Sequence, residues 1–249
     1  MRVWIGLTAA LVLAAGCGKK DETADKAGDS AASAPTAGLP GMSGTSAAET
    51  APAPIQARTL RLGQAVLNNP SDAQIAMAYY QIAALPMPLD RWASQDSRVN
   101  SANEFDRPEV LSVVKQELTS AAAAMDGTGF VKINTDMSFG EYDHDALGYR
   151  MSGIESDRYY HWNFRGAQYR LTMENGDEAR LWHLPPDEAR GVLERLPSRH
   201  VNVTLMIKIV DAVPDGSGGI LKGRIASYEI YTPDRRNAIK LGTVAVPGV

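Results

Sequence analysis

Two histidines, an arginine and several side-chain amides fall in a stretch of the sequence that predicts paired β-strands. Residues 159–164 and 167–173 alternate between polar and apolar side chains, and Arg165-Gly166 between them is typical of a tight hairpin turn. Asn175-Gly176 is a second turn signal, so a strand over residues 178–184 should pair next. Alternation then collects polar side chains on one face, where they could recognise an acidic partner or a carbohydrate. The candidates on this recognition face are Tyr159, His161, Asn163, Gln168, Arg170 and His183.

The two turn lengths also predict a register for the opposite, apolar face. Trp162 should face Tyr169, and Tyr169 should face Trp182, which makes a buried aromatic ladder. On the polar face, His161 and His183 would be separated by two strand spacings, about 9 to 10 Å, which is too far for both to bind one metal ion. We therefore expect no metal there, and the alternative to a binding role is an ordinary solvated sheet surface.

A second group of chemically capable side chains is the acidic run Glu141-Tyr142-Asp143-His144-Asp145. Clustered carboxylates can bind Ca²⁺, and paired acids can act in general acid–base catalysis. The run lacks the Asp-x-Asp-x-Asp-Gly spacing of a calcium loop, and on a strand the three acids would share one face while His144 points to the other. An exposed acidic strand or turn explains the run more simply. We assign no catalytic residue, metal or cofactor.

Helices are predicted in the first half of the region that must hold these residues. Ser71-Asp72-Ala73-Gln74 is a capping box before an apolar series at helical spacing, which ends at Pro86. A second amphipathic helix is predicted over residues 106–126, with a proline in its first turn and a glycine after it. Residues 86–105 between the two helices are expected to form a polar loop.

Strands are predicted in the second half. From Phe130 onward the hydrophobic period is two, and the strongest alternation covers residues 200–210 and 219–232, which a glycine-rich turn connects. A short helix is predicted after Pro185-Pro186. The predicted fold class is α+β, with N-terminal helices packed on a mostly antiparallel sheet that contains one inserted helix.

Composition excludes several classes of function. The chain has 249 residues, with 25 Lys and Arg against 29 Asp and Glu and a formal charge of −4, so it offers no basic field for nucleic acid. Cys17 is the only cysteine. The residues after it can therefore supply no disulfide, no thiolate nucleophile and no cysteine-ligated metal, which suits an oxidising compartment.

The N-terminus has the organisation of an exported protein. An apolar run from Val3 to Ala15 covers about 20 Å at ~1.5 Å per residue, too little to span a bilayer core. The run ends in Leu13-Ala14-Ala15-Gly16-Cys17, which resembles the lipobox of bacterial lipoproteins. The resemblance implies that residues 1–16 are a cleaved signal peptide and that Cys17 becomes a lipidated N-terminus anchored in a membrane. Gly18 in place of Asp implies the periplasmic face of the outer membrane.

The rest of the chain is expected to form a tether and one domain. Residues 17–57 are rich in Ala, Ser, Thr, Gly and Pro, a composition typical of disorder, and residues 58–249 suffice for a single α+β domain. We expect a non-catalytic binding or accessory module of the cell envelope, whose partner is an envelope protein or polysaccharide. The alternative is an envelope hydrolase that uses His161, His183 or the acids of Glu141–Asp145.

Overall fold

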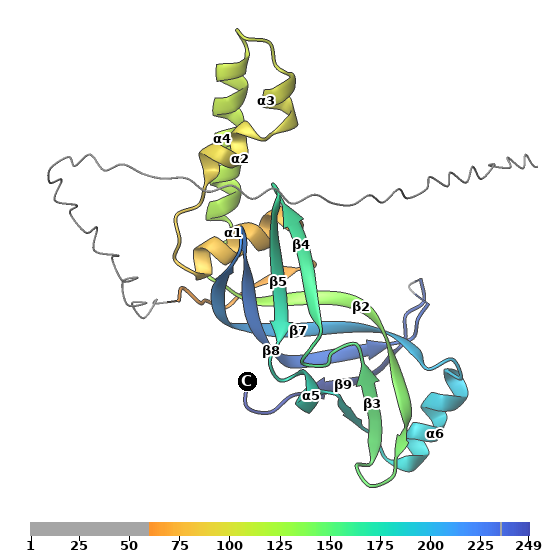
Figure 1. Ribbon diagram of the computed structural model, residues 1–249. Coiled ribbons are helices and arrows are strands. Elements are labelled where there is room, and N and C mark those ends of the chain that lie inside the picture. Colours follow the sequence, from red (N-terminus) through yellow and green to blue (C-terminus); the bar gives the residue numbers. More distant parts are fainter. Residues whose placement is uncertain (1–59, 235) are drawn as a thin grey trace, which may run out of the picture. The chain divides into compact units, whose positions relative to one another are not determined.

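A nine-stranded sheet dominates the part of the chain that the computed structural model describes, residues 60–234 and 236–249 (Figure 1). Seven strands follow the order β4-β5-β8-β7-β2-β3-β6, while β1 pairs with β2 and β9 pairs with β8. The β1–β2 and β5–β8 pairs are parallel and the other pairs are antiparallel. The strands are β1 (Ala65–Asn68), β2 (Thr128–Asp143), β3 (Gly148–Ser152), β4 (Tyr159–Phe164), β5 (Ala167–Met173), β6 (Leu181–His183), β7 (His200–Asp215), β8 (Gly218–Tyr231) and β9 (Lys240–Ala245).

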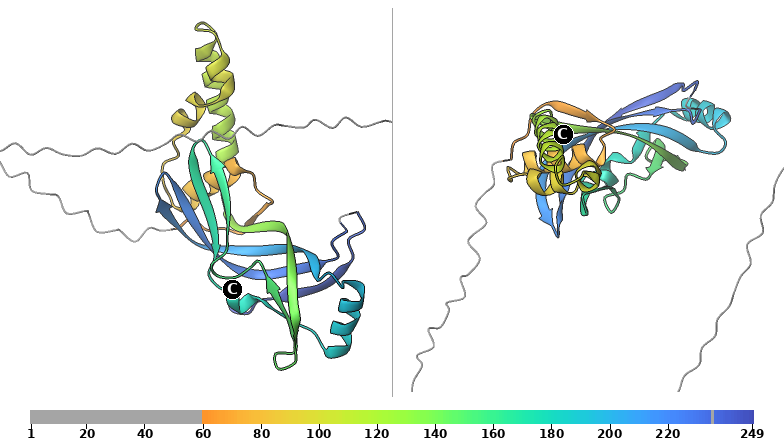
Figure 2. Two further views of the ribbon diagram at one scale, coloured as in Figure 1. Left: turned by 45° about the vertical axis from the view of Figure 1, so that its right-hand side comes forward. Right: turned by 90° about the horizontal axis from the view of Figure 1, so that it is seen from above.

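The sheet curls into a half-barrel because its central strands are long and irregular (Figures 1 and 2). β2 and β7 have 16 residues each and β8 has 14. Register shifts in the β7–β8 pair lie between Met206 and Ile207 and between Ile209 and Asp211. Bulges of this kind increase the local twist of a strand pair. β2 pairs with β7 along its first part and with β3 along its last, so its two ends belong to different parts of the sheet.

Helix α1 lies on the sheet, and local chemistry sets its start. The Ser71 hydroxyl accepts a hydrogen bond from the Gln74 backbone N–H, and the Gln74 side chain accepts one from the Ser71 N–H at 2.9 Å, which confirms the predicted capping box. Tyr79 packs where Gly219 leaves room on β8, since a Cβ at Gly219 would lie 2.1 Å from the Tyr79 ring. The helices are α1 (Asp72–Ile82), α2 (Leu89–Ser94), α3 (Ser97–Ser101), α4 (Arg107–Ala123), α5 (Gly176–Ala179) and α6 (Pro186–Arg195).

The predicted arrangement, N-terminal helices packed on a mostly antiparallel sheet, is wrong. Strands take 41% of the described residues against 28% for helices, and the helices form no N-terminal layer on the sheet. β1 precedes them, α5 and α6 interrupt the series of strands, and α2, α3 and α4 pack chiefly on one another and on α1. The physical reason is that long, bulged strands curl around their own apolar face and leave little of it for a helical layer to cover.

The hairpin of β4 and β5 has the predicted register, and Trp162 faces Tyr169. Arg165 and Gly166 both have positive φ, as a two-residue turn of type I′ requires. The second predicted turn is wrong. The buried Asn175 side chain instead accepts a hydrogen bond from the Ile225 N–H at 2.7 Å and donates one to the Ile225 carbonyl at 3.0 Å. That pairing continues the β5–β8 contact beyond β5, so β6 pairs with β3 and Trp182 does not face Tyr169.

Helices α2, α3 and α4 form an arm that projects beyond the sheet (Figures 1 and 2). Residues 86–105, predicted as a polar loop, contain α2 and α3 instead. The arm has a small apolar cluster of its own, in which Ala93, Val99 and Val114 are buried. This cluster explains why residues 86–105 form helices, because α2 and α3 each bury at least one apolar side chain against α4.

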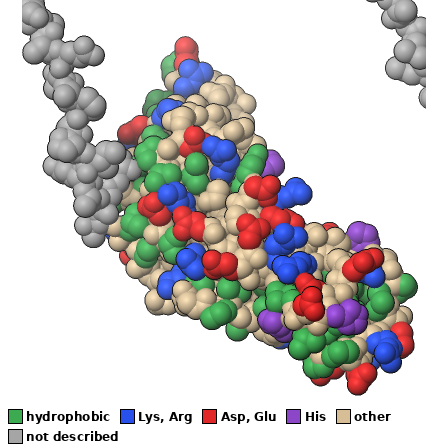
Figure 3. Space-filling view, turned by 60° about the horizontal axis from the view of Figure 1, so that its bottom comes forward, with side chains coloured by type: hydrophobic (Ala, Val, Ile, Leu, Met, Phe, Trp, Pro, Cys, Tyr) green, Lys and Arg blue, Asp and Glu red, His purple; other side chains and the backbone are tan. Residues whose placement is uncertain are grey.

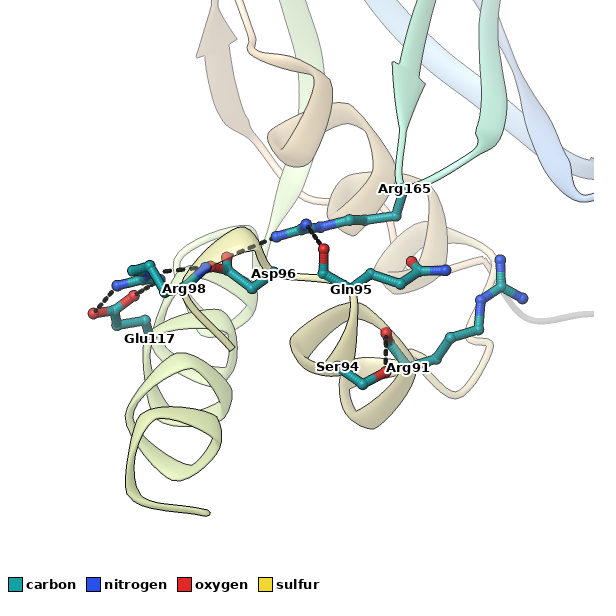
Figure 4. Close-up of polar contacts among 7 residues, drawn as sticks. All are labelled: Arg91, Ser94, Gln95, Asp96, Arg98, Glu117 and Arg165. Atoms are coloured by element: carbon teal, nitrogen blue, oxygen red, sulfur yellow. Dashed lines mark hydrogen bonds and ion pairs between the residues drawn. The ribbon is translucent and has the colours of Figure 1, made fainter. Parts of the chain in front are cut away.

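One ion-pair network joins the arm to the β4–β5 turn (Figure 4). Arg165 donates to the Gln95 carbonyl at 2.6 Å and to the Asp96 carboxylate at 2.8 Å. Asp96 also accepts hydrogen bonds from the side chain and backbone of Arg98, and these hold the Asp96 pKa at about 2, below its ordinary value of 3.8. We call the contacts of Arg165 with Gln95 and Asp96 the clasp. Beside the clasp, the Trp92 and Phe164 rings meet edge to face at 5.0 Å. The arm is therefore attached at a few specific contacts.

The predictions for the N-terminal region concern residues outside the described part of the chain. These are the signal peptide over residues 1–16, the lipidated Cys17 and the tether over residues 17–57. None of the helices in the described residues is both long enough and apolar enough to cross a membrane.

Candidate functional site

The structure brings five of the six residues of the predicted recognition face together. On β4, Tyr159, His161 and Asn163 are exposed, and His161 pairs with Arg170 while Asn163 pairs with Gln168 on β5. His183 is separate from them, because β6 pairs with β3 and His183 lies opposite Gly148. His183 was predicted on this face only because a hairpin turn was predicted at Asn175-Gly176, and the structure has no such turn there.

Several side chains of the recognition face already interact with neighbours in the same chain. The Arg170 guanidinium forms an ion pair with Asp215 and lies 5.6 Å from the centre of the Tyr159 ring. The Tyr159 and His161 rings are 6.4 Å apart. Because its only cation is paired with a carboxylate, this face is poorly suited to an acidic partner.

The acidic run at the end of β2 forms a turn. One Asp143 oxygen accepts hydrogen bonds from the backbone N–H groups of Asp145 and Ala146, and the other accepts one from Arg150 at 3.2 Å. These bonds, that from Ala146 foremost, lower the pKa of Asp143. No group of three His, Cys, Asp or Glu side chains in residues 60–234 and 236–249 is placed to hold a metal ion. The run acts as a turn former in the described structure.

The residues that a hydrolase would need are dispersed. His161 is on β4, His183 is on β6, and the acids of Glu141–Asp145 lie at the β2–β3 turn. Neither of the two histidines hydrogen-bonds a carboxylate within the described part of the chain. General acid–base chemistry needs the two groups within reach of one reacting atom, and this arrangement does not provide that.

A cavity that the sequence did not reveal lies on the polar face of the central strands. It has a volume of about 380 Å³. Register explains how it forms, because Asn134 on β2 pairs with Thr204 on β7, and Asn202 on β7 pairs with both Asp136 on β2 and Tyr231 on β8. The cavity is lined by Asn134, Thr135, Asp136, Asn202, Val203, Thr204, Tyr231 and Ala238.

Hydrogen bonds hold the amides of this cavity in defined orientations. The Thr204 hydroxyl donates to the Asn134 side-chain oxygen at 2.8 Å, so the Asn134 NH₂ group remains as a donor that makes no hydrogen bond to another described residue. The Asn202 NH₂ group donates to the carbonyls of Thr232 and Pro233, at 3.3 and 3.1 Å. Its side-chain oxygen is then the acceptor that Asn202 presents. The cavity thus combines an oriented donor with an oriented acceptor.

An ion pair beside the cavity positions its aromatic ring. The Tyr231 hydroxyl donates to Glu229 at 2.9 Å, and Lys240 donates to the other Glu229 oxygen at 2.6 Å. The bond from Lys240, with that from Tyr231, lowers the pKa of Glu229, and the bond to Glu229 raises the pKa of Tyr231. Tyr231 therefore stays a neutral phenol near neutral pH, and the charges of Glu229 and Lys240 offset each other.

A second hollow, of about 270 Å³, adjoins the cavity and shares Asn134 with it. His161 lines this hollow with Trp162, whose indole N–H donates to the Pro70 carbonyl at 3.1 Å. The curl of the sheet thus brings part of the predicted recognition face next to the cavity. On the face in Figure 3, acidic and basic side chains are interspersed, with no broad field of one sign.

The polar cavity could not be singled out from its residues. Asn134, Asp136, Asn202 and Thr204 occupy alternate positions on their strands, which is the usual pattern of any solvent-facing sheet surface. The available signal was that β2 and β7 carry amides and hydroxyls there in place of the more usual Lys and Glu. The chain matches no protein-family model, no curated protein and no solved structure.

Proposed function

We propose that the protein is a lipid-anchored, non-catalytic binding module of the cell envelope, held through Cys17 at the periplasmic face of the outer membrane. Its ligand is an uncharged, polyhydroxylated chain, the chemistry of an envelope polysaccharide. The observation that carries this proposal is the open cavity of about 380 Å³ on β2, β7 and β8, in which amides and hydroxyls predominate.

The chemistry of the cavity fits a sugar. Each sugar hydroxyl is both a donor and an acceptor, and the Asn134 NH₂ group and the Asn202 side-chain oxygen supply the matching pair. The Tyr231 ring adds an apolar surface against which C–H groups can pack. The offset charges of Glu229 and Lys240 favour a neutral ligand over an ionic one.

The same lining argues against hydrolysis at this site. Most glycoside hydrolases need two carboxylates on either side of the bond that is broken, about 5 to 9.5 Å apart. Among the described residues that line the cavity, Asp136 is the one carboxylate and none is a histidine. Binding without turnover is the function that these side chains support.

The test is a comparison of two surfaces on the full chain, purified in detergent. Purified cell-wall sacculi and neutral oligosaccharides serve as probes, in co-sedimentation and in calorimetric titration. Asn134→Ala should weaken binding about fivefold, and the double variant with Asn202→Ala about twentyfold, because each removes roughly 1 kcal/mol of hydrogen bonding. Gln168→Ala, an exposed amide on β5 outside the cavity, is the matched control and should bind normally.

Two results would contradict the proposal. One is failure of every glycan probe to bind the unmodified chain. The other is loss of binding in Gln168→Ala with full binding in Asn134→Ala, which would move the site to the predicted face of β4 and β5. Fractionation of cells that produce the chain with Cys17→Ser tests the anchor separately, since that variant should leave the membrane fraction.

A further inference from the structure

An apolar groove runs between α3 and α4 of the arm, away from the polar cavity of the sheet. Its volume is about 490 Å³. Val114 at its floor is buried, whereas Val113 on the same helix is 47% exposed. The groove is lined by Arg98, Ser101, Ala102, Asp106, Glu109, Val110, Val113 and Val114.

The arm leaves two large apolar side chains, Val113 and Phe105, exposed to solvent. Phe105, in the turn before α4, is 84% exposed, the most exposed of the large hydrophobic side chains in the described residues. Along its 17 residues α4 buries only Val114 and Ala122. Exposed apolar patches with a polar rim mark interaction surfaces more often than isolated exposed residues do.

The rim of the groove is acidic. Arg98, the one basic residue in the lining, is already paired with Glu117 at 2.6 Å and with Asp96 at 3.1 Å. Glu109 lies in the lining, and Glu104 and Asp106 flank Phe105 in sequence. Arg107 lies beside the groove too, where it donates to the Ala102 carbonyl at 3.1 Å. The two carboxylates of the lining, Asp106 and Glu109, therefore face one base, Arg107, that no described carboxylate pairs with, and the border keeps an excess of negative charge.

We propose that this groove binds an amphipathic helix of a partner protein, with apolar side chains on one face and Lys or Arg on its borders. A helix laid along α4 would place residues spaced three and four apart over Val110, Val113 and Val114. Its basic residues would meet Glu109 and Asp106, the two carboxylates of the lining. The contact would cover Val113, which the packing of α4 on α1, α2 and α3 leaves 47% exposed.

Two other occupants fit the charges less well. An anionic lipid surface would be repelled by the acidic rim. A second copy of the chain would have to supply a basic helix, yet none of the longer described helices carries a net positive charge. The only charged residue of α1 is Asp72, α4 has two bases against two acids, and α6 has two bases against three acids. Charge complementarity thus selects a basic helix from a different protein.

The test uses the full chain in detergent and a fluorescent 18-residue peptide of Leu and Lys, arranged as an amphipathic helix. We expect saturable binding in fluorescence anisotropy. A peptide of the same pattern with Glu in place of Lys should bind at least about tenfold more weakly, because it meets the acidic rim. Val113→Asp should weaken binding of the Lys peptide by about tenfold or more, because the contact would bury an unpaired charge.

Ser112→Asp is the matched control. It adds the same charge one residue away on α4, at an exposed position outside the groove, and should leave the affinity unchanged or slightly higher. Equal loss in both aspartate variants, or equal binding of the Lys and Glu peptides, would overturn the proposal. If Val113→Asp disturbs folding, Val113→Ser replaces it, since it removes apolar contact area from the groove lining without adding a charge.

A photo-cross-linking residue at position 113 in living cells extends the test to the natural partner. The proposal requires cross-links to a partner segment that forms an amphipathic helix. Its apolar residues should recur every three or four positions, with Lys or Arg beside them. Cross-links only to lipid, or only to another copy of the chain, would contradict it. Charge reversal by Glu109→Lys should reduce the yield of these cross-links severalfold, because it removes an acid of the groove lining and adds a base.

Discussion

The curled sheet and the helical arm of this protein are stabilised by very different amounts of buried side chain. Leu205, Ile207 and Leu221 belong to a continuous apolar cluster that extends through the sheet and α1, and each is completely buried. In the arm, Trp92 and Ala122 join that cluster, and the remaining buried side chains, Ala93, Val99 and Val114, form a small separate one. The sheet can therefore hold a binding cavity rigidly, whereas the arm is the part that a partner can stabilise.

The largest difference should appear when each cluster loses side-chain volume. Leu205→Ala should lower the free energy of unfolding by about 3 kcal/mol, since it leaves a cavity in the sheet core. Val114→Ala should chiefly speed hydrogen exchange in α2–α4. Urea unfolding and exchange mass spectrometry measure the two effects, with Leu62→Ala, at a side chain 42% exposed, as a control. A larger loss of global stability from Val114→Ala would break the comparison.

Removal of the buried amide at Asn175 should have the next largest effect. Asn175→Ala leaves the Ile225 N–H and carbonyl without their partners, which should cost about 2 to 3 kcal/mol of unfolding free energy. Asn163→Ala removes an exposed amide and should change stability little. Thermal and urea unfolding of both variants measure the two changes in unfolding free energy. Equal stability would show that the bonds to Ile225 do not hold the β5–β8 pairing.

Loss of the clasp should affect the arm alone. Arg165→Ala removes the hydrogen bonds to Gln95 and Asp96, so amide exchange in α2 and α3 should rise about tenfold while β7 and β8 stay protected. Arg158→Ala, which removes a more exposed ion pair with Glu155, is the control. Faster exchange throughout the sheet would mean that the arm and the sheet unfold together.

A smaller effect should follow from acid. The Asp96 pKa is about 2, below the ordinary value, so its ionised form is stabilised by Arg98 and Arg165 in the folded chain. A lowered folded pKa adds stability that is complete above about pH 4 and is lost as the pH falls toward 2. The protection of amides in α2 and α3, taken relative to the intrinsic exchange rate at each pH, should fall over that interval, and in Asp96→Asn it should not change with pH. Persistence of the unmodified chain's pH profile in Asp96→Asn would remove Asp96 from the clasp.

Those parts of the fold that depend on neighbours in the chain were predictable. The capping box at Ser71 and the turn at Arg165-Gly166 each involve residues no more than three apart, and both formed as expected. Asn175-Gly176 is a strong turn signal of the same local kind, yet it was overridden because the Asn175 amide pairs with Ile225 on a distant strand. Local signals hold only until a buried long-range partner competes for the same groups.

The sequence by itself determined the alternation of β4, β5, β7 and β8, the β4–β5 register, the helices α1, α4 and α6, and the absence of thiol chemistry after Cys17. Only the tertiary structure decided which strands are neighbours. Alternation tells which side chains face solvent, but it carries no information about the strand alongside. The cavity that joins Asn134, Asn202 and Tyr231 arises from three strands brought together in space, so no single stretch of sequence contains it.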